Sequence, residues 1–192
     1  MLTRHAHSTL NVESRVNGDP SVPAPLTADG RAEAARLGHQ LSQLPFELCV
    51  VTRFARTRET ADAILAGRDV PRLEEPLLDD IDVGELEGSS LDAYRAWKRA
   101  HERDEPFPGG ESLDDAARRY ATALRRLVDR PERALLVVCH EIPVRYALNA
   151  AAGSADLDAP EHAISNATPY LFDEAALTRA AGRIAALTGA DP

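Results

Sequence analysis

Leu2-Thr3-Arg4-His5 is a short apolar run that ends in an arginine and a histidine, just before a polar, turn-forming stretch. A second histidine ends the most apolar run of the chain, where Ala134-Leu135-Leu136-Val137-Val138-Cys139 leads into His140. An imidazole at such a position can act as a nucleophile, a general base, a charge partner or a metal ligand. Two of them, one beside an arginine, indicate a site that handles phosphate.

Short apolar runs alternate with helix-like blocks along the rest of the chain, which is typical of an α/β sheet. The other expected strands are Leu48–Val51, 134–139 and 168–172. The expected helices cover 31–44 after an N-cap at Thr27, a segment ending near Leu65, 91–101, Leu113–Val128 after an N-cap at Ser112, a helix starting near Pro143, and Glu174–Leu187. We therefore expect a single α/β domain over residues 1–192, a three-layer sandwich whose mostly parallel central sheet has helices on both faces.

The charge balance argues against two classes of partner. The chain has 22 Lys and Arg against 31 Asp and Glu, a formal charge of -9 and a pI near 5.1. This charge opposes binding to nucleic acid or to an anionic membrane surface. It permits a small phosphorylated substrate, because a few local arginines can outweigh a distant negative background.

Nothing in the sequence indicates export or a membrane span. No apolar run approaches the roughly 18 residues that a spanning helix needs, and the first residues lack the pattern of a signal peptide. Cys49 and Cys139 each lie in or at the end of a strand-like run. We expect both to be buried free thiols, in a cytoplasmic protein.

Four side chains follow predicted strands and should meet. Loops at the carboxyl ends of parallel strands converge on one crevice. Arg4, His5, Arg56 and His140 occupy such loops. The planar guanidinium of arginine matches the oxygens of a phosphate, so this edge of the sheet is the predicted site.

Six segments resemble, in order, motifs of the histidine phosphatase superfamily, the phosphoglycerate mutase-like proteins. Arg4-His5-Ala6 is similar to the Arg-His-Gly signature, and Pro108-Gly109-Gly110-Glu111-Ser112 matches its family segment outright. The remaining similar segments are 26–34, 52–60 (which places the second phosphate arginine at Arg56), 78–88 and 137–145. Each motif alone is weak evidence, but six in the family order are strong.

The resemblance implies a mechanism that needs no metal or other cofactor. His5 would attack phosphorus and form a phosphohistidine, while Arg4, Arg56 and His140 bind the equatorial oxygens. Asn11 would add a neutral donor. A carboxylic acid would protonate the leaving group and later activate water.

Departures from the family pattern leave the identity of that acid open. The usual glutamate aligns with Asp80, which is one methylene shorter, and Glu141 replaces a common glycine at a position where a related branch carries its acid. We favour Asp80 over Glu141, with Asp82 third. Ala6 replaces the glycine after the nucleophile.

The predicted function is hydrolysis of a phosphomonoester on a small phosphorylated metabolite, by a monomer or homodimer. The short stretch between Gly88 and Pro108 favours a phosphatase over a phosphoglycerate mutase-type phosphotransferase, since mutases carry longer insertions here. A non-catalytic phospho-ligand-binding protein is a further alternative. The family also suggests a final strand pair where the periodicity of the tail predicts a helix.

Other polar and aromatic residues have simpler interpretations. Tyr94 and Trp97 are expected to pack against the core, although the family places this segment over the active site. Glu111 and Ser112 are expected to begin a helix. Arg118-Arg119 and Arg125-Arg126 are expected on a solvated face.

His7 raises a competing hypothesis of a metal-dependent phosphoesterase. His5-Ala6-His7-Ser8 has the His-x-His spacing of such enzymes, which need further ligands. The remaining histidines are His39, His101, His140 and His162, and they show no paired-ligand spacing. We predict that EDTA leaves phosphatase activity unchanged in a colorimetric phosphate assay. Loss of activity that Zn²⁺ or Mn²⁺ restores would support the metal site instead.

Overall fold

The central sheet of the computed structural model, which describes residues 1–159 and 164–189, has five strands in the order β3-β2-β4-β1-β5. They are β1 (Leu2–Arg4), β2 (Leu48–Val51), β3 (Arg72–Glu74), β4 (Leu135–Cys139) and β5 (Pro169–Tyr170). The first four pair in parallel, and β5 runs antiparallel to β1 at one edge. The expectation of a mostly parallel sheet is confirmed.

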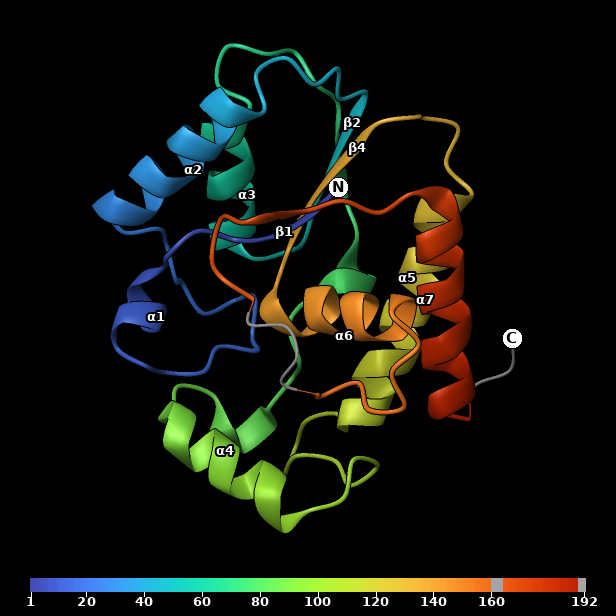
Figure 1. Ribbon diagram of the computed structural model, residues 1–192. Helices are drawn as coiled ribbons and strands as arrows, with labels where there is room; N and C mark the ends of the chain where they lie inside the picture. Colours follow the sequence, from blue (N-terminus) through green and yellow to red (C-terminus); the bar gives the residue numbers. More distant parts are fainter. Residues whose placement is uncertain (160–163, 190–192) are drawn as a thin grey trace.

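Helices cover both faces of this sheet (Figure 1). One layer holds α2 (Ala28–Gln40) and α3 (Ala55–Ile64), and the other holds α5 (Leu113–Val128), α6 (Glu141–Ala151) and α7 (Glu174–Leu187). The short α1 (Thr9–Val12) and α4 (Leu91–Ala100) lie beyond the carboxyl ends of the strands, next to two 3-10 turns, Pro76–Leu78 and Gly84–Leu86. No helix in the described ranges is long and apolar enough to cross a membrane.

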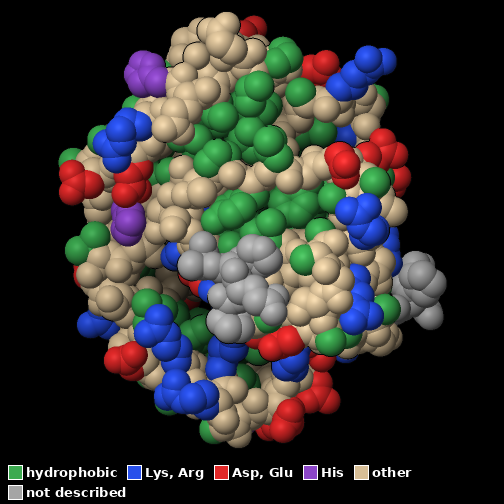
Figure 2. Space-filling model, viewed as in Figure 1, with side chains coloured by type: hydrophobic (Ala, Val, Ile, Leu, Met, Phe, Trp, Pro, Cys, Tyr) green, Lys and Arg blue, Asp and Glu red, His purple; other side chains and the backbone are tan. Residues whose placement is uncertain are grey.

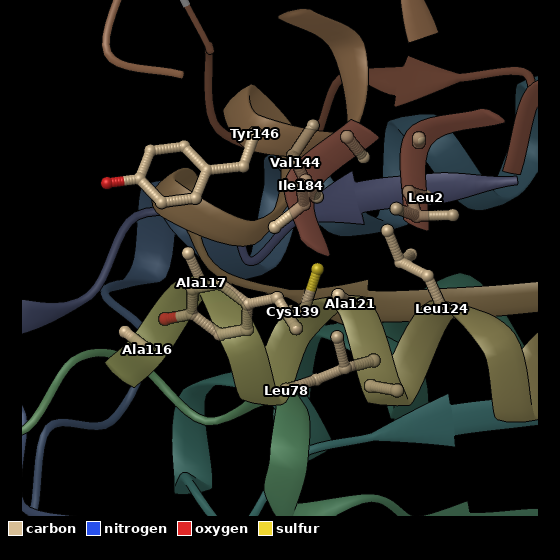
Figure 3. Close-up of a cluster of buried hydrophobic side chains, with 14 of the residues drawn as sticks. Leu2, Leu78, Ala116, Ala117, Ala121, Leu124, Cys139, Val144, Tyr146 and Ile184 are labelled. Atoms are coloured by element: carbon tan, nitrogen blue, oxygen red, sulfur yellow. The ribbon is translucent and has the colours of Figure 1, made fainter. Parts of the chain in front are cut away.

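The local sequence explains the main elements. All four residues of β2 are buried, as expected for a strand covered on both faces. Ser112 and Asp115 form a reciprocal capping box at the start of α5. Figure 3 shows Ala121 and Leu124 of α5 beside Leu2 and Cys139 of the sheet, within one buried cluster. Cys139 and Cys49 are both buried free thiols, as predicted.

Element boundaries differ modestly from the predictions. The bounds of β2, α5 and α7 match, and α4 ends one residue early. The tail is therefore a helix, not a strand pair. Of the expected strand 168–172 only β5 forms, and β3 was not predicted because its three residues are mostly exposed and lack an apolar run.

Two glycines, Gly84 and Gly110, allow the segment at residues 82–84 to pack closely against the loop before α5. Gly84 has φ +51°, and a Cβ there would lie 2.2 Å from the Pro108 carbonyl oxygen. A Cβ on Gly110 would lie 2.4 Å from the Asp82 carbonyl oxygen. Any side chain at either position would push the two loops apart. This contact helps to place the loop that carries Asp80.

Candidate active site

The ends of β1 and β4 bring the two predicted histidines together. Arg4 is in register with Cys139, and the backbone N–H of His5 donates to the Cys139 carbonyl at 2.9 Å. His5 and His140 therefore leave adjacent parallel strands on the same side, with ring centroids 5.5 Å apart. The predicted convergence is confirmed.

The hydrogen bonds of His5 define its tautomer. Its Nδ1 lies 2.8 Å from the carbonyl oxygen of Ala6, which can only accept, so Nδ1 carries the proton. Arg56 Nε donates to His5 Nε2 at 3.0 Å, so Nε2 presents its lone pair. Burial, together with the charges of Arg56 and Arg4, holds the pKa of His5 well below its usual value. His5 is thus a neutral imidazole with its lone pair on Nε2, the electron pair that a nucleophile requires, and this lone pair accepts from Arg56 in the structure.

His140 is held in the opposite tautomer. Arg56 Nη2 donates to its Nδ1 at 3.2 Å, so Nε2 carries the proton and donates to Thr52 Oγ1 at 2.9 Å. The Thr52 hydroxyl in turn donates to Thr57 Oγ1 at 3.0 Å, and the Thr57 hydroxyl donates to the carbonyl of Phe54 at 2.9 Å. Burial and the Arg56 charge lower the pKa of His140 well below its usual value. The ring is fully buried and its orientation is fixed by this chain of donors.

Arg56 is the buried centre of the site. Besides both histidines, its guanidinium donates to the side-chain oxygen of Asn17, to the Asn17 carbonyl at 3.1 Å and to Asp80 Oδ2 at 3.1 Å. The Phe54 ring lies 4.1 Å below it. Sequence analysis missed Asn17, because Asn17-Gly18 signals only a turn. Glu87 orients the Asn17 amide at 2.8 Å.

Arg4 lines the same pocket as Arg56. Its Nη1 donates to the carbonyl of Ile164 at 2.9 Å and pairs with Glu141 Oε2 at 2.9 Å. Its Nε is buried and has no hydrogen-bond partner within the described part of the chain. Glu141 also pairs with Arg145. Arg4 therefore keeps one donor without a partner among the described residues, and its role in binding phosphate stays a prediction.

Asp80 is the carboxylate nearest to the histidines. Its Oδ2 lies 3.1 Å from Arg56 Nη2 and 3.4 Å from His140 Nδ1. Burial raises the pKa of Asp80 above its usual value, although the charge of Arg56 opposes this shift. The site therefore keeps a proton on Asp80 to higher pH than on an exposed aspartate, which suits a general acid.

Arg119 places the Asp80 loop, and the prediction that it lies on a solvated face is wrong. It donates to the carbonyls of Leu77, Asp79 and Asp80 at 3.0, 2.7 and 2.9 Å. Glu111, expected only to begin a helix, holds Arg119 through two bonds of 3.0 and 2.5 Å. Its place in the Pro-Gly-Gly-Glu-Ser segment is thereby explained: the segment positions the candidate acid.

One pocket of about 380 Å³ collects the predicted residues. It is lined by all of them except His140, namely Arg4, His5, Asn11, Arg56, Asp80 and Glu141. Further basic side chains surround it, namely Arg15, Arg95, Lys98, Arg99 and Arg145. Figure 2 shows Lys and Arg side chains gathered where α4 lies in Figure 1. A locally positive pocket on an acidic protein favours a phosphorylated ligand.

Two residues that the sequence analysis considered, Asn11 and Asp82, make fewer contacts with the site than expected. Asn11 lines the pocket, but its side-chain oxygen accepts from the backbone and hydroxyl of Ser8 at 3.1 and 3.0 Å, so only its amide nitrogen can serve a ligand. Asp82 is exposed and accepts from the Gly84 backbone at 2.9 Å, outside this pocket. Tyr94 lines the pocket, whereas Trp97 stacks on Phe107 at 4.0 Å.

The described surroundings of His7 do not form a metal site. His7 pairs through Nδ1 with Glu33 at 2.9 Å and is half exposed, on the α2 side of the chain. Within residues 1–159 and 164–189, no group of three His, Cys, Asp or Glu side chains could hold an ion. His162 lies outside the described residues.

Comparison with known proteins identifies the family. A family model described as the histidine phosphatase superfamily (branch 1) matches residues 1–176. The chain therefore belongs to the histidine phosphatase superfamily. A 2,3-bisphosphoglycerate-dependent phosphoglycerate mutase from Methylobacterium sp. (strain 4-46) is 33% identical over 159 residues, which cover 73% of this chain and 74% of that protein.

Other matches carry both mutase and phosphatase names. The 2,3-bisphosphoglycerate-dependent phosphoglycerate mutase 2 of Gloeobacter violaceus is 34% identical over 131 residues, 62% of this chain, and the match spans 58% of that relative's length. The solved alpha-ribazole phosphatase from Shigella flexneri superposes with a TM-score of 0.70 at 26% identity, covering 80% of this chain and 79% of that one. The family is thus established, whereas the choice between hydrolysis and transfer is not made by these relatives.

Replacing His140 tests the account of its pKa. The unfolded chain binds a proton on His140 near pH 6.5, whereas the folded chain binds one only at lower pH, so acid favours unfolding. Between pH 7 and pH 5.5, the free energy of unfolding of the wild type should fall more steeply than that of His140→Gln. The difference in slope reaches at most about 1.4 kcal/mol per pH unit. Equal slopes in urea titrations would contradict a neutral His140.

Proposed function

We propose that this protein is a phosphomonoester hydrolase that acts through a phosphohistidine on a small phosphorylated metabolite. The observation that carries the proposal is the tautomer of His5. Its Nε2 lone pair adjoins the buried Arg56 guanidinium, in a pocket shared with the Asp80 carboxyl group. Membership of the histidine phosphatase superfamily supports the same chemistry.

In the first step, His5 Nε2 attacks phosphorus in line and forms a P–N bond while the ester P–O bond breaks. Arg4 and Arg56 bind the equatorial oxygens, where the transition state holds its charge. The leaving alkoxide takes the proton of Asp80 and departs as an alcohol. His140, which is fully buried and does not line the pocket, holds the Arg56 guanidinium in place by accepting from it at Nδ1.

In the second step, water attacks phosphorus and the P–N bond breaks. The Asp80 carboxylate, left by the first step, accepts a proton from that water. Inorganic phosphate leaves, and His5 and Asp80 return to their starting states. Every proton transfer is therefore assigned to a group that lines the pocket.

A phosphoglycerate mutase-type phosphotransferase is the second candidate, because two relatives carry mutase names. The two functions share the first step and differ in the acceptor, which is water in one and a second hydroxyl in the other. Free phosphate released in proportion to substrate consumed supports hydrolysis. Product phosphorylated at a new hydroxyl, without free phosphate, supports transfer.

Asp80→Asn tests the role of the general acid. We expect kcat/KM on an alkyl phosphate such as a sugar phosphate to fall by about 10²- to 10³-fold, because the alkoxide is then left unprotonated. On p-nitrophenyl phosphate the loss should be less than about tenfold, since that leaving group is stable as an anion. We also expect kcat/KM of the wild type to fall at alkaline pH as Asp80 loses its proton, and this fall should be absent from Asp80→Asn.

The controls are His5→Ala and Asp82→Asn in the same phosphate-release assay. His5→Ala should lose turnover of both substrates, which excludes a contaminating phosphatase. Asp82→Asn should behave as wild type, because Asp82 lies outside the pocket. Equal losses on both substrates for Asp80→Asn would rule out its acid role, and absence of turnover in the wild type would favour the binding protein.

A further inference from the structure

Glu141 introduces a negative charge into the pocket where the family pattern has a glycine. It is the first residue of α6 and directly follows His140. One carboxylate oxygen lies 2.9 Å from Arg4 Nη1, and the other pairs with Arg145. Glu141 thus bridges two guanidinium groups that line the same pocket as His5.

Guanidinium groups occupy both carboxylate oxygens of Glu141. One oxygen accepts from Arg4 and the other from Arg145. Asp80, by contrast, is the carboxylate beside both Arg56 and His140. The two acids therefore occupy different positions: Asp80 lies beside His140, whereas Glu141 lies between Arg4 and Arg145.

The charge of Glu141 bears directly on phosphate. Among the described residues, six arginines and one lysine line the pocket with only two carboxylates, Asp80 and Glu141, and Arg4 and Arg145 are the arginines that Glu141 contacts. Removing the Glu141 charge would leave Arg4 and Arg145 uncompensated. The side chains of Arg4 and Glu141 are 18% and 34% exposed, so solvent screens this effect only in part.

We propose that Glu141 is a built-in counter-ion, a positioning residue that holds Arg4 in place and lowers the affinity of the pocket for the phosphate anion. The proposal rests on the phosphate site of the proposed function. Substrate and inorganic phosphate share the same dianionic group, so binding that group tightly stabilises both ground states and slows product release. Glu141 limits this uniform binding while leaving the guanidinium geometry intact.

Glu141→Gln is the matched variant, because the amide oxygen can still accept from Arg4 while the charge is lost. Titration calorimetry with inorganic phosphate should show about tenfold tighter binding than to the wild type, as expected when one unit charge is removed several ångströms from a dianion in a partly solvated site. The gain should shrink in 0.5 M salt, a test concentration chosen to shorten the screening length to about half its physiological value. Phosphate should also become a stronger competitive inhibitor.

Arg145→Gln provides a second, opposite test. It leaves Glu141 with Arg4 alone, so inorganic phosphate should bind more weakly than to the wild type. The double variant Glu141→Gln/Arg145→Gln should lie between the two single variants. Melting curves identify a variant that fails to fold, and the other single variant then decides the outcome.

Two results would overturn the proposal. One is unchanged or weaker phosphate binding by a folded Glu141→Gln. The other is a selective loss of kcat on alkyl phosphates by that variant, which would make Glu141 the acid. Because calorimetry with phosphate needs no turnover, it reports on Glu141 even if the protein proves to be a transferase or a binding protein.

Discussion

The buried guanidinium of Arg56 is the interaction on which the rest of the site depends. It donates to His5, Asn17, Asp80 and His140 from a position that is only 3% exposed. Burying a charge is costly unless its donors are satisfied, and here each partner accepts. Because an arginine can only donate, it forces an accepting nitrogen on both histidines.

The scaffold around Arg56 makes this arrangement possible. Parallel pairing of β1 with β4 places His5 and His140 side by side, and the start of α3 delivers Arg56 between them. On the opposite side, Glu111 holds Arg119, which binds the carbonyls of the loop that carries Asp80. The order of the parallel strands therefore positions His5 and Arg56. The loop that Arg119 and Glu111 hold in place positions Asp80.

The sequence was sufficient to predict this framework because the catalytic candidates follow strands. Arg4, His5, Arg56 and His140 could be assigned to one crevice from the convergence of parallel strand ends alone. Their motifs lie at element boundaries, where a short pattern constrains the backbone. The bounds of β2 could also be predicted, because all four of its residues are buried and apolar.

Features that depend on loop geometry could not be predicted. Asn17 reaches Arg56 only through the folded path of its loop, and no local pattern distinguishes it from an ordinary turn residue. Arg119 appeared solvated, since helical periodicity does not reveal carbonyls brought in from residues 77–80. His7 had metal-like spacing, yet its ring turns away to pair with Glu33.

The most direct test of the account is the site of phosphorylation. Rapid alkaline quenching of the wild type during turnover, followed by ³¹P NMR of the denatured protein, distinguishes phosphate on Nε2 from phosphate on Nδ1. The account predicts an acid-labile phosphohistidine at His5 with phosphorus on Nε2, the nitrogen that accepts from Arg56. Phosphorus on Nδ1, on another residue, or direct transfer to water with no phosphoenzyme would contradict it.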